Sequence, residues 1–227
     1  MNYCRTARIY QLLESLFIGP SLLQARVAQL SQLGRAAPIE HALLVGEGNG
    51  SFLLPFVRRF PKTRITVIDQ SAAMLRIAQS RLAAAGLQST EIEFIVADVT
   101  TLRLPARRYD LLVTQFFFDN FSTPKVQQIM AQLEQASTAQ ARWLLADYCL
   151  PGNGWRAWRA KIWLRLLYSF FGLVADVPVR ALPEIEAAIA ATSFQCIERR
   201  SLCGAMLFSA CYTRRYRRTA PNTVAAS

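Results

Sequence analysis

Three glycines follow a short apolar run near residue 45 and suggest that the backbone there approaches a ligand. The run 42–45 reads ALLV, and Gly46, Gly48 and Gly50 come directly after it, although the whole chain of 227 residues has only ten glycines. Glycine tolerates positive φ and leaves room where a Cβ would collide with a bound molecule. The spacing departs from the G-x-G-x-x-G fingerprint of dinucleotide sites, because Ser51 stands at the third glycine position. No GK[ST] follows, which disfavours an ATP or GTP site.

Two aspartates end the next two apolar runs along the chain. Asp69 ends the stretch RITVID and Asp98 ends the stretch EIEFIVAD. A carboxylate about twenty residues after such glycines accepts the hydroxyl groups of a ribose. A second carboxylate at the next strand tip suits an exocyclic amine such as that of adenine. The pattern predicts a nucleoside pocket without a phosphate-binding element.

Alternating strands and helices are expected to position these residues. Apolar runs predict strands at 41–45, 64–69, 91–98, 109–118 and 141–148. Helical spacing and capping residues predict helices at 51–60, 71–86 and 124–138, between those strands. This alternation is typical of a Rossmann-like, doubly wound α/β fold with right-handed crossovers. In such a sheet, ligands bind beyond the carboxyl ends of the strands.

The two ends of the chain depart from this alternation of strands and helices. Two helices, at 3–17 and 21–33, are expected before the first strand, separated by Gly19-Pro20. After Pro151 we expect a long aromatic helix, a helix starting at Pro183, and a hairpin of strands at 194–198 and 205–213. The expected fold is a seven-stranded, mostly parallel sheet with a C-terminal β-hairpin and an N-terminal helical lid. The corresponding division of the chain is a lid at 1–36, a catalytic domain at 37–213 that includes an aromatic lid helix at 154–172, and a basic tail at 214–227.

The ordered set of motifs resembles a known enzyme family. The stretches LLVGEGNG, VIDQSAAMLRIAQSRL and IEFIVADVTTLRLPARRYDLLVTQFFFDNF follow one another between residue 42 and about residue 148. Together they look like a class I S-adenosylmethionine-dependent methyltransferase. Within that superfamily the pattern is most similar to the small-molecule methyltransferases of ubiquinone and menaquinone biosynthesis. The resemblance implies S-adenosylmethionine as the cofactor and transfer of its methyl group to a small acceptor.

The same resemblance implies a role for each matching position. Residues of the glycine loop would line the methionine end of the cofactor, Asp69 would hold the ribose, and residues past the fourth strand would lie near the sulfonium and the substrate. The implied set is Gly46, Glu47, Gly48 and Gly50 in the loop, Asp69, then Gln70, Met74, Asp98 and Val99 around the adenine, and Thr114, Gln115 and Phe116 past the fourth strand.

One position departs from the family pattern. The family usually has an acidic residue two positions before the first glycine, and this chain has Leu44 there. Glu47, one residue beyond that glycine, is a candidate to take over the contact with the amino end of the cofactor.

Polar residues at the tips of the fourth and fifth strands are candidates for acting on the acceptor. Asp119 and Asn120 follow QFFF, and Tyr148 ends the fifth strand. Asp119 is a candidate general base, Asn120 a candidate substrate ligand and Tyr148 a candidate for orienting the substrate. The alternative for Asp119 and Asn120 is an ordinary helix cap before Pro124.

Two further substrate contacts are expected from the lid segments. These are Tyr10, on the first helix, and Trp158, on the aromatic helix. Three interpretations of the aromatic helix stay open: a lid over an apolar substrate, contact with an anionic membrane surface, and plain packing. Its basic residues scatter around the axis at about 100° per residue, which favours the lid.

Charge and cysteine content limit the remaining function classes. The net charge of +11 and the run RRYRR at 214–218 fit an anionic partner, so an rRNA or tRNA methyltransferase is one alternative and a non-catalytic cofactor-binding or lipid-surface protein is another. Nucleic acid is disfavoured because TQFFFDNF replaces the motif of enzymes that methylate base amino groups. Five cysteines without a CxxC pair and a single histidine predict no metal site. We expect a cytoplasmic monomer or homodimer, with possible peripheral contact at the inner face of the membrane.

Overall fold

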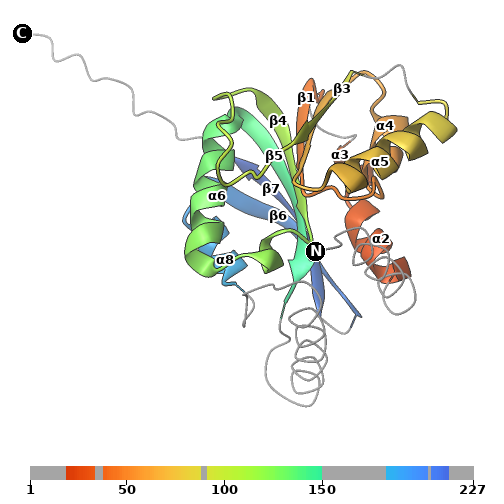
Figure 1. Ribbon diagram of the computed structural model, residues 1–227. Coiled ribbons are helices and arrows are strands. Elements are labelled where there is room, and N and C mark those ends of the chain that lie inside the picture. Colours follow the sequence, from red (N-terminus) through yellow and green to blue (C-terminus); the bar gives the residue numbers. More distant parts are fainter. Residues whose placement is uncertain (1–18, 34–37, 88–90, 150–182, 204–205, 215–227) are drawn as a thin grey trace, which may run out of the picture.

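Seven strands form one sheet in the computed structural model, which describes residues 19–33, 38–87, 91–149, 183–203 and 206–214 (Figure 1). The strands are β1 (His41–Val45), β2 (Arg64–Asp69), β3 (Ile92–Val96), β4 (Tyr109–Gln115), β5 (Ser137–Tyr148), β6 (Phe194–Leu202) and β7 (Leu207–Arg214). Their order is β3-β2-β1-β4-β5-β7-β6. Strands β1 to β5 pair in parallel, and β7 runs antiparallel to both β5 and β6. The predicted mostly parallel sheet with a C-terminal hairpin is confirmed.

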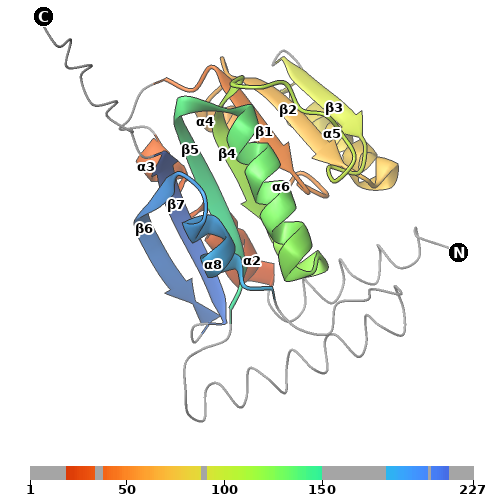
Figure 2. The ribbon, with the colours of Figure 1, turned by 90° about the vertical axis from the view of Figure 1, so that its left-hand side faces the viewer.

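Helices cover both faces of the sheet (Figure 2). The helices are α2 (Gly19–Val27), α3 (Leu30–Leu33), α4 (Leu53–Arg59), α5 (Ala72–Ala84), the 3-10 turn η1 (Phe118–Asn120), α6 (Thr123–Ala136) and α8 (Ile185–Ala190). Helices α6 and α8 pack on one face, and α3, α4 and α5 on the other. Neighbouring residues of β1 illustrate this, since Leu43 joins the core under α6 and Leu44 joins the core under α4. Burial on both faces explains why the central strands read as continuous apolar runs.

The carboxyl ends of β1 and β4 meet at the point where the strand order reverses. From β1 the chain builds outward to β2 and β3 on one side, and then continues on the other side with β4 and β5. Loops that leave such neighbouring strands in opposite directions create a crevice between them. The topology therefore places the glycine loop after β1 and the turn after β4 on the two sides of one crevice.

Several element boundaries differ from the sequence expectations. The helix predicted at 21–33 is divided by a turn at 28–29 into α2 and α3. The strand predicted at 109–118 ends at Gln115, because Phe116 has φ of +53° and turns the chain out of the sheet. Arg214, assigned to the basic tail from sequence, is the last residue of β7.

Some predicted features lie outside the described residues. These are the helix at 3–17 with Tyr10, the aromatic helix at 154–172 with Trp158, and the tail at 215–227. Within the described ranges, none of the helices combines the length and the apolar character that crossing a bilayer requires.

Candidate functional site

A cavity of about 170 Å³ opens at the carboxyl edge of the sheet, where the strand order reverses. Its walls come from four places: the end of β1, the end of β2, the segment after β3, and the turn after β4. Predicted site residues in its lining are Gly46, Asp69, Gln70, Asp98, Val99, Phe116 and Asn120. The remaining lining residues are Val45, Ile68, Ala97, Phe117 and Phe121. Seven side chains or backbone positions from four separate sequence segments thus meet at one site.

All three loop glycines adopt left-handed backbone conformations. Their φ angles are +69° at Gly46, +66° at Gly48 and +80° at Gly50, which L side chains rarely adopt. A Cβ on Gly46 would lie 2.5 Å from Cδ2 of Phe117, and a Cβ on Gly50 would lie 3.0 Å from the backbone of Ala78. A Cβ on Gly48 would meet no atom within 4 Å. Gly46 and Gly50 are therefore needed for packing, whereas Gly48 faces open space.

This difference gives a prediction about stability. Gly48→Ala and Gly50→Ala each add one Cβ at a similar positive φ, so the backbone strain is similar in the two variants. Only Gly50→Ala adds steric overlap with Ala78. Overpacking of this kind costs about 1–3 kcal/mol, so Gly50→Ala is expected to melt roughly 2–10 °C below Gly48→Ala. Calorimetric Tm values of the two variants would check this, and equal values would contradict the packing role of Gly50.

Asp69 is held in one orientation by two backbone amides. Gly48 N donates to Oδ2 at 2.9 Å and Ser71 N donates to Oδ1 at 2.8 Å. Ser71 also caps α5 by accepting from Met74 N at 3.3 Å. Burial raises the pKa of Asp69, and the two amide bonds oppose that shift. Each carboxylate oxygen keeps a second lone pair, so the group can accept one more hydrogen bond per oxygen, as the two hydroxyls of a ribose require.

The segment after β3 forms the adjacent wall. Val99 is buried, while Asp98 is exposed and accepts from Thr100 N through Oδ1 at 2.8 Å. Both line the cavity beside Gln70. Met74 lies on α5 outside the residues that line the cavity.

Glu47 is turned away from the cavity and into the protein. Its Oε1 accepts from the backbone N–H groups of Phe52 and Leu53, both at 2.9 Å, at the start of α4. Burial raises the pKa of Glu47 to about 7, and the positive charge of Arg26 is the largest opposing effect. Leu44 is fully buried in the apolar core on the α4 face. The structure thus gives Glu47 a capping role and leaves Leu44 without access to a ligand.

The raised pKa of Glu47 predicts a pH dependence of stability. The pKa of Glu47 is about 7 in the folded state, whereas the ordinary pKa of a glutamate is 4.5. Proton binding by Glu47 therefore adds to the free energy of unfolding in full below pH 4.5, and this contribution is lost as the pH rises through 7. Glu47→Gln keeps an oxygen for both amides and removes the charge. We expect the free energy of unfolding of the variant to match that of the parent at pH 5 and to exceed it by about 2–3 kcal/mol at pH 8.

Urea denaturation of both proteins at the two pH values measures this difference. The substitution Glu184→Gln, at an exposed glutamate, serves as the control and is expected to change stability equally at both pH values. A Glu47→Gln effect that is the same at pH 5 and pH 8 would refute the assignment.

Thr114 and Gln115 make contacts inside the protein. Thr114 Oγ1 accepts from Trp143 Nε1 at 2.9 Å, and Gln115 Nε2 donates to the carbonyl of Arg26 at 2.9 Å. Both are buried and neither lines the cavity. Their neighbour Phe116 does line it, and its ring packs edge-on against Tyr148 at 5.4 Å between centroids.

Two carboxyl groups lie close to the turn that follows β4, with Asp119 in the turn and Asp147 on the neighbouring strand β5. Asp147, at the end of β5, is fully buried and accepts from Phe118 N at 3.1 Å and Tyr148 N at 2.8 Å. Burial and the charge of Asp119 raise its pKa well above the ordinary value. Burial raises the pKa of Asp119 to about 7, and its Oδ1 accepts from Asn120 Nδ2 at 2.9 Å. Asp119 is therefore poised to change protonation near neutral pH.

The sequence pattern predicts no function for Arg26 or Asp147, which the structure places beside the cavity wall and behind the turn after β4. Arg26 is a buried arginine with 8% of its surface exposed, and its guanidinium carbon lies 5.2 Å from the centroid of the Phe116 ring. A charged residue on a helix predicts exposure, so nothing in the local pattern distinguished it. For Asp147, its position at the carboxyl end of a buried strand was the available signal.

Comparison with known proteins identifies the domain around this cavity. Residues 42–138 match a family described as a methyltransferase domain. Over this segment the chain is similar to methyltransferase domains. The resemblance inferred from the glycine loop, Asp69 and Asp98 is thereby confirmed.

Individual relatives are distant and partial. The chain is 28% identical over 132 residues to a demethylmenaquinone methyltransferase of Thermotoga maritima, covering 58% of this chain and 51% of that protein. It is 34% identical over 70 residues to a release factor glutamine methyltransferase of Koribacter versatilis, covering 31% and 24%. The chain thus spans about a quarter and about half of the lengths of these curated relatives.

The fold recurs among solved methyltransferases. The magnesium protoporphyrin IX methyltransferase of Synechocystis PCC 6803, determined with bound SAH, superposes with a TM-score of 0.62 at 18% identity. The match covers 86% of this chain and 82% of that one. Within the described residues, no group of three or more His, Cys, Asp or Glu side chains is arranged to hold a metal ion.

Proposed function

We propose that this protein transfers the methyl group of S-adenosylmethionine to a small apolar or aromatic acceptor. The observation that carries the proposal is Asp69, fixed by two backbone amides in the wall of the cavity at the strand-order reversal. When bound, the cofactor supplies a methyl group activated by its sulfonium. Everything else in the reaction depends on binding, alignment and exclusion of water by the protein.

The donor set of the cavity fits an adenosyl group. The remaining lone pairs of Asp69 suit the two ribose hydroxyls, and Asp98, with one oxygen held by Thr100 N, suits the amine of adenine. Val99 and Ile68 add apolar surface to the same lining. The open space at Gly48 leaves its backbone accessible.

The acceptor side of the cavity is aromatic. Phe116, Phe117 and Phe121 line it, and the rings of Phe117 and Phe121 lie 5.0 Å apart. Such a wall favours a flat, apolar acceptor that packs against ring faces or edges. A quinone-like or phenolic molecule has this shape.

Asp119 is the proposed general base. With its pKa near 7 it is partly ionised at neutral pH, so it can take the proton that a hydroxyl or amine acceptor loses. Asp147 is the buried carboxyl behind it and holds the turn through the amide of Phe118.

The proposal is tested by incubating the purified protein with S-adenosylmethionine labelled in the methyl group and a panel of phenols, quinols, amines and thiols. Label transfer to an aromatic acceptor is the expected result. Binding of S-adenosylhomocysteine without transfer to any acceptor would favour the non-catalytic alternative. Transfer to rRNA or tRNA alone would favour the nucleic-acid alternative.

A further inference from the structure

Helix α2 is docked on the carboxyl edge of the sheet by two buried hydrogen bonds. Gln115 Nε2, at the tip of β4, donates to the carbonyl of Arg26 at 2.9 Å, and Ser209 Oγ, on β7, donates to the carbonyl of Ala25 at 2.7 Å. Figure 1 shows α2 at this end of the sheet, near the carboxyl ends of the strands. The bonds come from strands far along the chain and fix the last turn of α2 beside the crevice.

The Arg26 side chain lies next to the cavity wall. Its guanidinium stacks on the ring of Phe116, which lines the cavity, with 5.2 Å between the guanidinium carbon and the ring centroid. Its positive charge lowers the pKa values of both Glu47, in the glycine loop, and Asp119, in the turn after β4. The charge of Arg26 therefore influences carboxyl groups on both sides of the crevice, after β1 and after β4.

Sheet topology determines which part of the cofactor reaches Arg26. Asp98 and Asp69 occupy the tips of β3 and β2, so a base and sugar held by them lie over that half of the edge. The rest of the molecule must extend over the glycine loop toward β4, because β1 and β4 follow β2 in the sheet. That remainder is an amino acid, which ends in an α-carboxylate and an α-ammonium group.

The chain lacks the usual acidic residue at this end, since Leu44 is buried among apolar side chains. Other polar groups are nonetheless present beside Arg26. The amide oxygen of Gln115 is buried and has no hydrogen-bond partner among the described residues, although its amide nitrogen is bonded to the Arg26 carbonyl. This oxygen can accept one further hydrogen bond, although Gln115 itself does not line the cavity.

We propose, on the basis of the proposed function, that Arg26 binds the α-carboxylate of the cofactor. This contact replaces the one that an acid at position 44 would make with the α-ammonium group. A guanidinium forms two parallel hydrogen bonds with a carboxylate, and its weak hydration suits a buried site. The stacking on Phe116 holds the planar group in place for this contact.

The test compares two ligands that differ only in the amino-acid end. S-adenosylhomocysteine has the carboxylate, and 5′-methylthioadenosine has the same adenosyl thioether without it. Titration calorimetry of Arg26→Met is expected to show a 10- to 100-fold loss of affinity for S-adenosylhomocysteine and less than a twofold change for 5′-methylthioadenosine. Arg26→Lys is expected to lie between Arg26→Met and the parent, because it keeps the charge without the paired donors.

Arg142→Met is the matched control. Arg142 is equally buried, with 8% exposure, but donates to the carbonyl of Leu33 at 3.0 Å. Its replacement is expected to lower Tm without changing the ratio of the two affinities.

Two results would overturn the proposal in distinguishable ways. Equal weakening of both ligands in Arg26→Met would show that the side chain only supports the fold of the site. Failure of the parent protein to bind S-adenosylhomocysteine would overturn the proposed function and this assignment with it.

Discussion

Asp69→Asn is expected to weaken binding of S-adenosylhomocysteine by roughly 100-fold, because hydrogen bonds to a charged carboxylate contribute about 1.5–3 kcal/mol each. Asparagine keeps the size of the side chain but replaces one accepting oxygen with an amide that donates. It can no longer accept from Gly48 N, Ser71 N and two ribose hydroxyls together. Titration calorimetry of parent and variant measures the effect.

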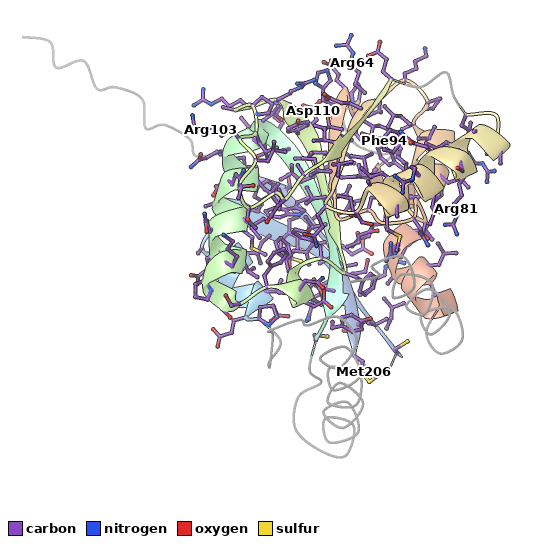
Figure 3. All side chains as sticks on the ribbon, in the orientation of Figure 1. Arg64, Arg81, Phe94, Arg103, Asp110 and Met206 are labelled. Atoms are coloured by element: carbon purple, nitrogen blue, oxygen red, sulfur yellow. The ribbon has the colours of Figure 1, made fainter. Side chains whose placement is uncertain are left out.

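Asp110→Asn provides the matched control for Asp69→Asn. Asp110 also fixes backbone, since its Oδ2 accepts from Glu40 N and His41 N, both at 3.1 Å. It lies at the opposite edge of the sheet, near Arg64 and far from Met206 (Figure 3). The control is expected to lower Tm and to leave ligand affinity within twofold. If both variants lost affinity equally, the loss would reflect stability and the assignment of Asp69 would be wrong.

Asp119→Asn is expected to lower kcat by about 10²- to 10⁴-fold for a hydroxyl acceptor, which is the usual contribution of a general base. The KM for S-adenosylmethionine is expected to stay within about threefold, because Asp119 lies outside the cofactor wall. Steady-state kinetics with the acceptor found in the panel separate these two effects.

The pH profile gives an independent readout for Asp119. Its carboxyl must be ionised to take a proton, so kcat/KM of the parent is expected to rise with pH through about 7 and to level off above that value. In Asp119→Asn this rise is expected to disappear. A profile that keeps the same midpoint in the variant would assign the titration to another group.

The sequence predicted the cavity wall well because strand tips follow from topology. Apolar runs that end at Gly46, Asp69 and Asp98 place those residues at one edge of a parallel sheet, whatever the details of packing. The capping of α5 by Ser71 was predictable for a similar local reason, since a serine before a helical pattern seldom has another role.

Side-chain direction at this edge was not predictable in the same way. Glu47 turns inward because the first amides of α4 need an acceptor, and Gln115 turns toward α2 because that helix docks there. The left-handed conformation of Phe116 changes which residues after β4 face the cavity, and a phenylalanine gives no signal of it. Arg26 depends on contacts with residues 115 and 209, which no local pattern encodes.

The central claim is that the crevice between the ends of β2, β1 and β4 binds an adenosyl group. A crystal structure grown with S-adenosylhomocysteine tests it most directly. We predict ligand density in the 170 Å³ cavity, with the ribose hydroxyls within hydrogen-bond distance of both Asp69 oxygens. Density in the 260 Å³ hollow at the opposite edge, lined by His41 and Arg64, or saturating ligand with the Asp69 cavity left empty, would contradict the claim.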